Sequence, residues 1–270
     1  MKTWDLLLLI RPSKLRCANL MAAASLYSLV ISYDVKCVLV DMPRGFEVFL
    51  HQFEGADDAL REAAKLGLLY CPQSIARAYE PLISCLIKLV RNGVKAVCYL
   101  DPDTVKSNHD LAIRASRLVL RASIKKLSDE DLEEWLQLLG EYGLQYLKLF
   151  NNMISHLTMV KARKAIILMG LEGFECARLL RREGLRVKVK TAGLPYLRSP
   201  LEIMCKKYLQ GKLTVDELKR LINEYVDYIK NYVLKYESLD EAHKAWSEKK
   251  APWLRSFASK IGMIDVFCKS

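Results

Sequence analysis

Apolar residues are distributed along the chain in two distinct patterns. Short runs that are apolar nearly throughout, such as KCVLVD at 36–41 and KAVCYL at 95–100, are separated by longer segments in which apolar residues recur every three or four positions. The first pattern is typical of buried β-strands and the second of amphipathic helices. The pattern predicts five main strands, at residues 5–10, 36–41, 95–100, 165–169 and 185–190.

The segments between and after these strands have helical length and periodicity. Gly93 ends one of them in the usual way, because glycine readily takes the left-handed conformation that closes a helix. Residues 68–70 are predicted to form a minor strand. The predicted helices span residues 13–33, 46–53, 56–66, 73–92, 105–126, 128–161 and 173–183, and the chain after Pro200 is predicted to be helical throughout.

Unbroken apolar strands separated by helices indicate an α/β fold, with a mostly parallel sheet of about five strands and helices on both faces. The last strand differs, because Arg186, Lys188 and Lys190 alternate with apolar residues there, which is typical of an edge strand guarded by charge. We expect residues 1–198 to form an α/β domain with a long helical insertion at about 104–162, and residues 199–270 to form a helical C-terminal appendage.

The composition is that of a folded, basic protein. Of the 270 residues, 51% are apolar and 27% are charged, which excludes disordered and collagen-like chains. The formal net charge of +11 favours anionic partners. Asn and Gln together number only 12, which resembles the composition of proteins from thermophiles. In such proteins charged networks stabilise the fold, so thermal stability is an alternative explanation for part of the basic surface.

The cysteines and the N-terminal segment indicate a soluble, cytoplasmic protein. None of the eight cysteines belongs to a C-x-x-C pair or a zinc-ligand pattern, so we expect reduced cysteines, mostly in the core. Residues 17–33 carry no charge and approach the length of a membrane span, but they are rich in Ala and Ser. Such small residues favour a helix packed closely on a sheet, and we expect no membrane association.

Polar or glycine-rich turns follow every predicted strand. In an open parallel sheet, ligands bind beyond the carboxyl ends of the strands, so we expect a ligand site at this edge. Basic side chains next to the start of a helix favour phosphate or carboxylate, and the turn after the first strand supplies two of them. The candidate ligand-binding or anion-binding residues are Arg11, Ser13, Lys14, Asp41, Arg44, Asp101, Asp103 and Glu172.

The acidic members of this set allow two interpretations. If Asp41, Asp101, Asp103 and Glu172 cluster, they are able to hold Mg²⁺ or to act as a general acid and base. If they do not, each is an ordinary turn carboxylate. No known catalytic motif is intact, so the sequence predicts binding of a small anionic or phosphorylated ligand and assigns no catalytic residue.

The alternative function is binding of nucleic acid, or assembly into a complex, through a basic surface. One predicted helix carries basic residues every three or four positions, and the last strand carries them at every second position. Such rows are able to track a phosphate backbone, although a charge run is more often a solvated face. The residues concerned are Arg114, Arg117, Arg121 and Lys125 on the helix, and Arg186, Lys188 and Lys190 on the strand.

The C-terminal region offers a third role as an interaction module. Apolar residues from Leu218 to Val233 recur at three- and four-residue steps, and tyrosines at 228, 232 and 236 lie among them. Packing on the α/β body is the first interpretation of this face. The second is an interface with a protein partner or a second copy, since tyrosine is enriched at such interfaces.

Three stretches together resemble the TraB / ChaN / erythromycin-esterase-like superfamily. They are residues 36–53 (KCVLVDMPRGFEVFLHQF), residues 79–102, which lead into KAVCYLDP, and residues 151–173, which run into AIILMGLEG. The resemblance implies the α/β fold and a ligand cleft for about residues 1–195. The family usually has Gly and His after the first strand, where this chain has Ile10-Arg-Pro-Ser13, and Glu after the second, where it has Asp41. The hydrolytic or haem-linked activity of the family is therefore not carried over.

Overall fold

The computed structural model describes residues 5–70, 73–160, 164–193 and 195–253. The strands in this part of the chain are β1 (Asp5–Ile10), β2 (Cys37–Pro43), β3 (Lys95–Leu100), β4 (Lys164–Met169) and β5 (Arg186–Thr191). The helices are α1 (Arg16–Tyr33), α2 (Phe46–Gln52), α3 (Ala56–Lys65), α4 (Gln73–Arg91), α5 (Pro102–Ile124), α6 (Asp129–Val160), α7 (Gly173–Arg182), α8 (Pro200–Leu209), α9 (Val215–Tyr228), the π-helical segment η1 (Ile229–Val233) and α10 (Leu239–Lys250).

These elements divide between two compact units. The first, which we call the α/β unit, contains residues 1–105 and 148–194. The second, which we call the helical unit, contains residues 106–147 and 195–270. The segment predicted as an insertion contributes to both, because the central part of the α5–α6 hairpin belongs to the helical unit.

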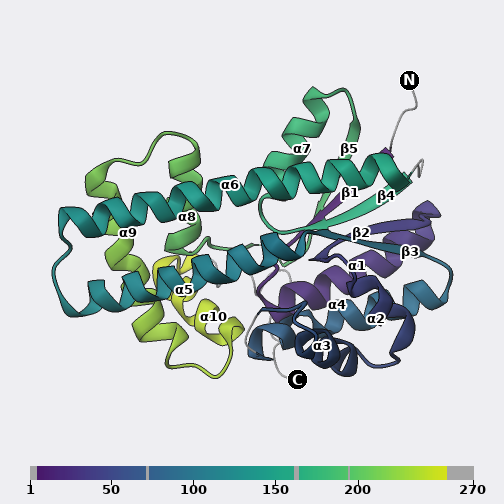
Figure 1. The fold of residues 1–270 in the computed structure, drawn as a ribbon, viewed down its shortest axis with the longest axis horizontal. Helices are drawn as coiled ribbons and strands as arrows, with labels where there is room; N and C mark the ends of the chain where they lie inside the picture. Colours follow the sequence, from purple (N-terminus) through teal and green to yellow (C-terminus); the bar gives the residue numbers. More distant parts are fainter. Residues whose placement is uncertain (1–4, 71–72, 161–163, 194, 254–270) are drawn as a thin grey trace. The chain divides into compact units, whose positions relative to one another are not determined.

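The α/β unit is built on a five-stranded sheet in the order β3-β2-β4-β1-β5, and every neighbouring pair is parallel. The α/β class and the parallel sheet predicted from the apolar runs are therefore confirmed. Parallel strands need crossover connections, and these are right-handed almost without exception, so the direction of each crossover decides which face its helix covers. The connections from β1 to β2 and from β2 to β3 run one way and place α1 and α4 on one face, whereas the connection from β4 to β5 runs back and places α7 on the other (Figure 1).

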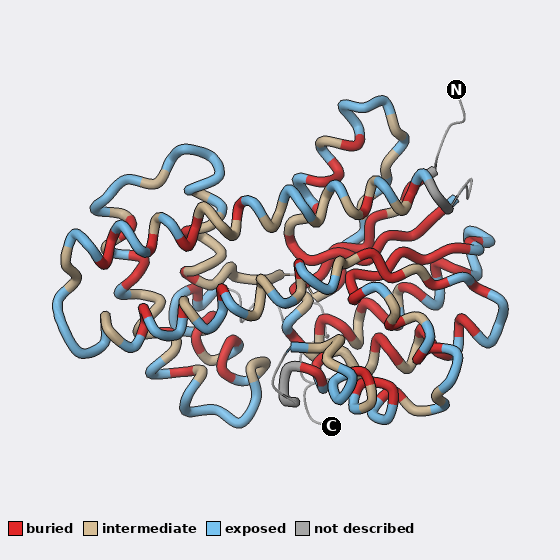
Figure 2. The backbone as a smooth tube through the Cα atoms, viewed as in Figure 1, coloured by how far each residue is buried: buried red, intermediate tan, exposed pale blue. Residues whose placement is uncertain are grey.

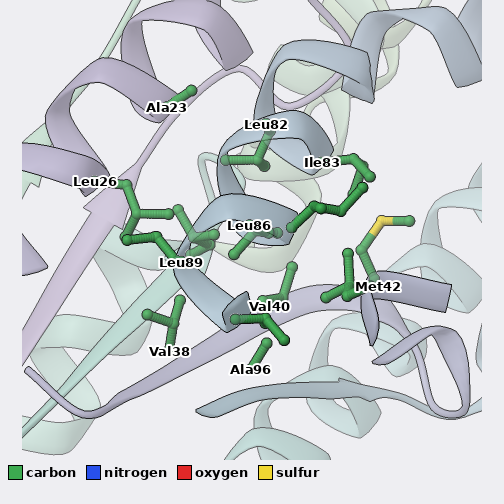
Figure 3. Close-up of a cluster of buried hydrophobic side chains, with 14 of the residues drawn as sticks. Ala23, Leu26, Val38, Val40, Met42, Leu82, Ile83, Leu86, Leu89 and Ala96 are labelled. Atoms are coloured by element: carbon green, nitrogen blue, oxygen red, sulfur yellow. The ribbon is translucent and has the colours of Figure 1, made fainter. Parts of the chain in front are cut away.

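The largest core cluster lies between the sheet and the helices α1 and α4. The strands are buried along most of their length, while β5 at the edge is not (Figure 2). Leu26 of α1 and Leu82, Ile83 and Leu86 of α4 pack against Val40 and its neighbours on the strands (Figure 3). Burying each large aliphatic side chain stabilises the fold by about 1.5–3 kcal/mol, so this layer holds α1 and α4 firmly in place.

The helical unit has its own core. Trp135 and Leu138 of α6, together with Leu118 of α5, pack against Met204 of α8 and Leu221 of α9. In the C-terminal region predicted to be helical, Thr214 is the N-cap of α9, and its side chain accepts a hydrogen bond from the backbone N–H of Glu217. The buried residues of the apolar face of α9, Leu218, Leu221 and Ile222, belong to the core of this helical unit, whereas the first interpretation expected the face to pack on the α/β body.

Local differences from the prediction concern the ends of elements. Residues 68–70 form no strand, and Leu68 instead packs against the core between the sheet, α1 and α4. The helix predicted from residue 13 begins at Arg16, because the backbone N–H of Leu15 closes a turn on the carbonyl of Pro12. The N-cap of α1 is therefore Leu15, and Ser13 lies before the helix. None of the described helices is long and apolar enough to cross a membrane.

Candidate functional site

The carboxyl ends of β2 and β4 lie side by side in the middle of the sheet. The chain leaves β2 towards β3 and leaves β4 towards β5, which lie on opposite sides of this pair. Such a reversal of direction is a topological switch point, where open α/β sheets bind ligands. Most of the candidate residues predicted from the strand-end turns belong to the ends of β1, β2, β3 and β4 in this same unit.

Arg11 and Asp41 form a buried ion pair beneath this edge. The Nη2 of Arg11 donates to Asp41 Oδ1 at 2.9 Å and its Nη1 donates to Oδ2 at 3.2 Å, while the Arg11 side chain is fully buried. Nη1 also donates to the carbonyl oxygen of Met169 at 3.3 Å. Burial alone would lower the pKa of Arg11, but the adjacent carboxylate of Asp41 raises the pKa above its usual value, so the guanidinium remains charged.

Asn19 connects this ion pair to the helices. Its Oδ1 accepts a hydrogen bond of 2.6 Å from Arg11 Nε, and its amide nitrogen donates to the carbonyls of Ser13, Leu15 and Ala78. The side chain of Asn19 is completely buried in α1. Arg11 therefore links β1, β2, β4 and α1, and an anion would reach its guanidinium only if the pair with Asp41 opened.

Glu172 lies in the turn between β4 and α7. Its Oε1 accepts a hydrogen bond of 2.8 Å from the backbone N–H of Gly170, so the carboxylate folds back over its own turn. Burial, with Asp41 nearby, raises the pKa of Glu172. Tyr99 of β3 is also buried here and donates its hydroxyl hydrogen to the carbonyl of Leu168, and its pKa is raised by burial and by Asp41.

The remaining candidates lie closer to solvent. Arg44, exposed, forms an ion pair with the half-buried Asp101, and its backbone N–H donates to the carbonyl of Leu100 at 2.7 Å. Lys14 is exposed, Ser13 is half-buried, and Asp103 is exposed in the first turn of α5. The edge thus has a buried charged layer, Arg11 and Asp41, and an outer layer that solvent reaches.

The acidic side chains do not gather into a metal site. Within the described residues, no group of three or more His, Cys, Asp or Glu side chains is placed to hold a metal ion. The reason is local: Asp41 is bound to Arg11, Asp101 is bound to Arg44, and Glu172 is bound to its own turn. The Mg²⁺ cluster considered from the sequence is therefore not formed by these residues.

The basic residues of α5 are mostly engaged with α6. Arg114 contacts both carboxylate oxygens of Glu141, at 2.6 and 2.7 Å. Arg121 pairs with Glu134 and Asp131, and Lys125 also pairs with Asp131, whose pKa is lowered to about 2, mainly by hydrogen bonds from Ser128. Arg117 is exposed. A phosphate backbone on this helix would have to compete with those ion pairs.

The basic residues of β5 are placed differently. Arg186, Lys188 and Lys190 are all exposed, and β5 is the outermost strand of the sheet, as the alternating pattern predicted. The Nζ of Lys188 lies 5.5 Å from the centre of the Tyr33 ring.

Sequence reasoning missed two residues of the buried layer, Asn19 and Tyr99. Asn19 had a visible signal, since it is the only amide within the uncharged segment 17–33, one helical turn beyond Leu15. Tyr99 had none, because a tyrosine in an apolar strand is ordinary and its partner carbonyl lies on a different strand.

Comparison of the chain with protein-family models, curated proteins and solved structures finds no match. The resemblance to the TraB / ChaN / erythromycin-esterase-like superfamily stays a prediction.

Proposed function

We propose that the protein binds a small anionic or phosphorylated ligand at the carboxyl edge of the sheet, over the switch point between β2 and β4. The observation that carries the proposal is the ionisable cluster of Arg11, Asp41 and Glu172 at this point. Burying charges is costly, and an apolar pair of similar size is often at least as stabilising. Clusters of perturbed ionisable groups are therefore concentrated at functional sites.

The outer layer would supply the ligand contacts. Arg44 and Asp101 form an ion pair of which both members reach solvent, and such pairs contribute only about 0–1 kcal/mol. Arg44 would therefore lose little free energy if it left Asp101 to pair with a phosphate group of the ligand. Lys14, exposed in the turn after β1, would add a second positive charge, and the hydroxyl of Ser13 would donate a hydrogen bond.

The buried layer would hold the site in shape. Arg11 fixes Asp41 and the end of β4 at once, so the turns after β1, β2 and β4 keep their positions without a ligand. Glu172 has a raised pKa, so its protonated form becomes available nearer to neutral pH than that of an ordinary glutamate. In that form its carboxyl group is able to donate a hydrogen bond to a phosphate oxygen.

Isothermal titration calorimetry with inorganic phosphate, nucleotides and sugar phosphates, each with and without Mg²⁺, tests the proposal. We expect at least one phosphate ester to bind, and Arg44→Gln to weaken it about tenfold, since a hydrogen bond between charged groups contributes about 1.5–3 kcal/mol.

Arg61→Gln is the control, because Arg61 also forms an ion pair that solvent reaches, with Asp57 on α3. This variant should bind like the wild type. Absence of binding by the whole panel at millimolar concentration would refute the proposal, as would equal losses in the two variants.

A further inference from the structure

The basic residues of β5 share one face of the sheet. In the parallel register of β1 and β5, Leu7 is opposite Lys188 and Leu9 is opposite Lys190. Residues opposite each other on neighbouring strands point to the same face, and Leu9 is buried in the core beneath α1 and α4. Arg186, Lys188 and Lys190 therefore point to the α1/α4 face, yet all three are exposed, so this face of β5 forms an open ledge beside the helical layer.

Helix α1 forms the wall of the ledge. Near the start of α1, a Cβ added to Gly193, just after β5, would lie 2.5 Å from the Cβ of Ala18. At its end, the ring of Tyr33 lies under Lys188. Residues seven apart share a helix face, so Ser25 and Ser32 lie on the same side of α1 as Ala18 and bring hydroxyl groups to the wall.

Protection of the sheet edge does not by itself account for this row. Charged side chains on an edge strand commonly prevent pairing with other sheets. Here Arg181 of α7 already occupies one acceptor of the edge, since its Nε and Nη2 donate to the carbonyl of Val187 at 3.2 and 2.9 Å. The row of three basic side chains is therefore an addition to a protection that Arg181 partly supplies.

We propose that this ledge binds single-stranded nucleic acid, with successive phosphates on Arg186, Lys188 and Lys190. Alternate residues of a strand are about 6.6 Å apart, which suits successive phosphates of an extended single strand. A positively charged track beside an exposed aromatic ring is the usual way to bind single strands without sequence preference, and Tyr33, 44% exposed, lies beside the row. A duplex would need a second row of cations for its other strand, and the wall of α1 carries serines there.

Fluorescence anisotropy with a labelled oligothymidylate over a salt series tests the proposal on the full chain. For single strands, the logarithm of the binding constant falls with the logarithm of the salt concentration, with a slope of about 0.7 per phosphate contact. Three contacts therefore contribute a slope of about 2. We expect the triple variant Arg186→Gln/Lys188→Gln/Lys190→Gln to flatten the slope by about that amount. The control triple variant Lys126→Gln/Lys212→Gln/Lys230→Gln removes the same charge from exposed positions of the helical unit and should keep the slope.

Substitutions of Tyr33 provide a second test, because they probe the contribution of the ring to binding affinity without changing the net charge. Tyr33→Phe keeps the ring and should bind within twofold of the wild type, whereas Tyr33→Ser should bind about tenfold more weakly. Circular dichroism confirms that each variant folds.

Three results would overturn the proposal: equal slopes for the two triple variants, equal binding by the two Tyr33 variants, or competition by poly-glutamate as strong as that by unlabelled oligothymidylate. The last result would indicate an acidic protein partner instead. The ledge is independent of the proposed phosphate-ester site, so Arg44→Gln should leave oligonucleotide binding unchanged, and each proposal is able to fail alone.

Discussion

Replacement of Asp41 by asparagine leaves the guanidinium of Arg11 charged and without its counterion. The side chain of Arg11 is completely buried, so water does not replace the two charge-assisted hydrogen bonds at 2.9 and 3.2 Å. Breaking a buried pair from one side costs about 3–5 kcal/mol. Asparagine keeps one oxygen acceptor, so we expect a loss near the lower limit, about 3 kcal/mol, from a total stability of about 5–15 kcal/mol.

A double-mutant cycle separates this cost from the value of the pair itself. Arg11→Met and Asp41→Leu should each destabilise the protein by at least about 3 kcal/mol, because each leaves one charge buried alone, while the double variant Arg11→Met/Asp41→Leu should lie within about 1 kcal/mol of the wild type, because it buries no charge. Urea unfolding followed by far-UV circular dichroism measures all three. Arg61→Met, which breaks an exposed pair, should cost at most about 0.5 kcal/mol. Additive losses in the cycle, or single losses below about 1 kcal/mol, would refute the reasoning.

Two further predictions concern other parts of the fold. Burial lowers the pKa of His243, so the unfolded chain binds a proton more readily; stability should be constant above about pH 6.5 and should fall below it by up to about 1.4 kcal/mol per pH unit. Tryptophan fluorescence during urea unfolding measures this, and the effect should persist in His51→Gln and disappear in His243→Phe. Gly193→Ala should cost about 2–4 kcal/mol in the same assay, because Gly193 has a φ of 72° and no room beside Ala18. Gly184→Ala, with a φ of 80° and nothing within 4 Å, should cost only about 1 kcal/mol, and equal losses would contradict the steric argument.

The strands were predictable because a strand buried on both faces appears in the sequence as a short, almost continuous apolar run. Each apolar run became a strand with ends within about two residues of the prediction, and the β3 prediction at 95–100 was correct at both ends. β2 continues past the predicted end at Asp41 to Pro43, since Arg11 satisfies the carboxylate of Asp41 inside the sheet. That partner is 30 positions away in the sequence, so a local pattern does not reveal it.

The location of the site was predictable, but the pairing of its side chains was not. Parallel topology brings the strand ends to one edge, which is why Arg11, Asp41 and Glu172 come together. The strand order decides which of them meet, and it depends on tertiary packing. For the same reason the sequence showed a basic row on α5 but not the acidic partners on α6, which lie up to 27 positions away.

The central claim, a ligand site over the switch point, is tested most directly by hydrogen–deuterium exchange with and without a saturating phosphate ester chosen by calorimetry. Ligand contacts protect the backbone amides that they order or cover. We expect added protection at residues 11–15 after β1, at residues 42–45 around the end of β2 and at residues 170–173 after β4, and none in α9 or α10. Unchanged exchange in these three segments, with protection elsewhere in the chain, would contradict the claim.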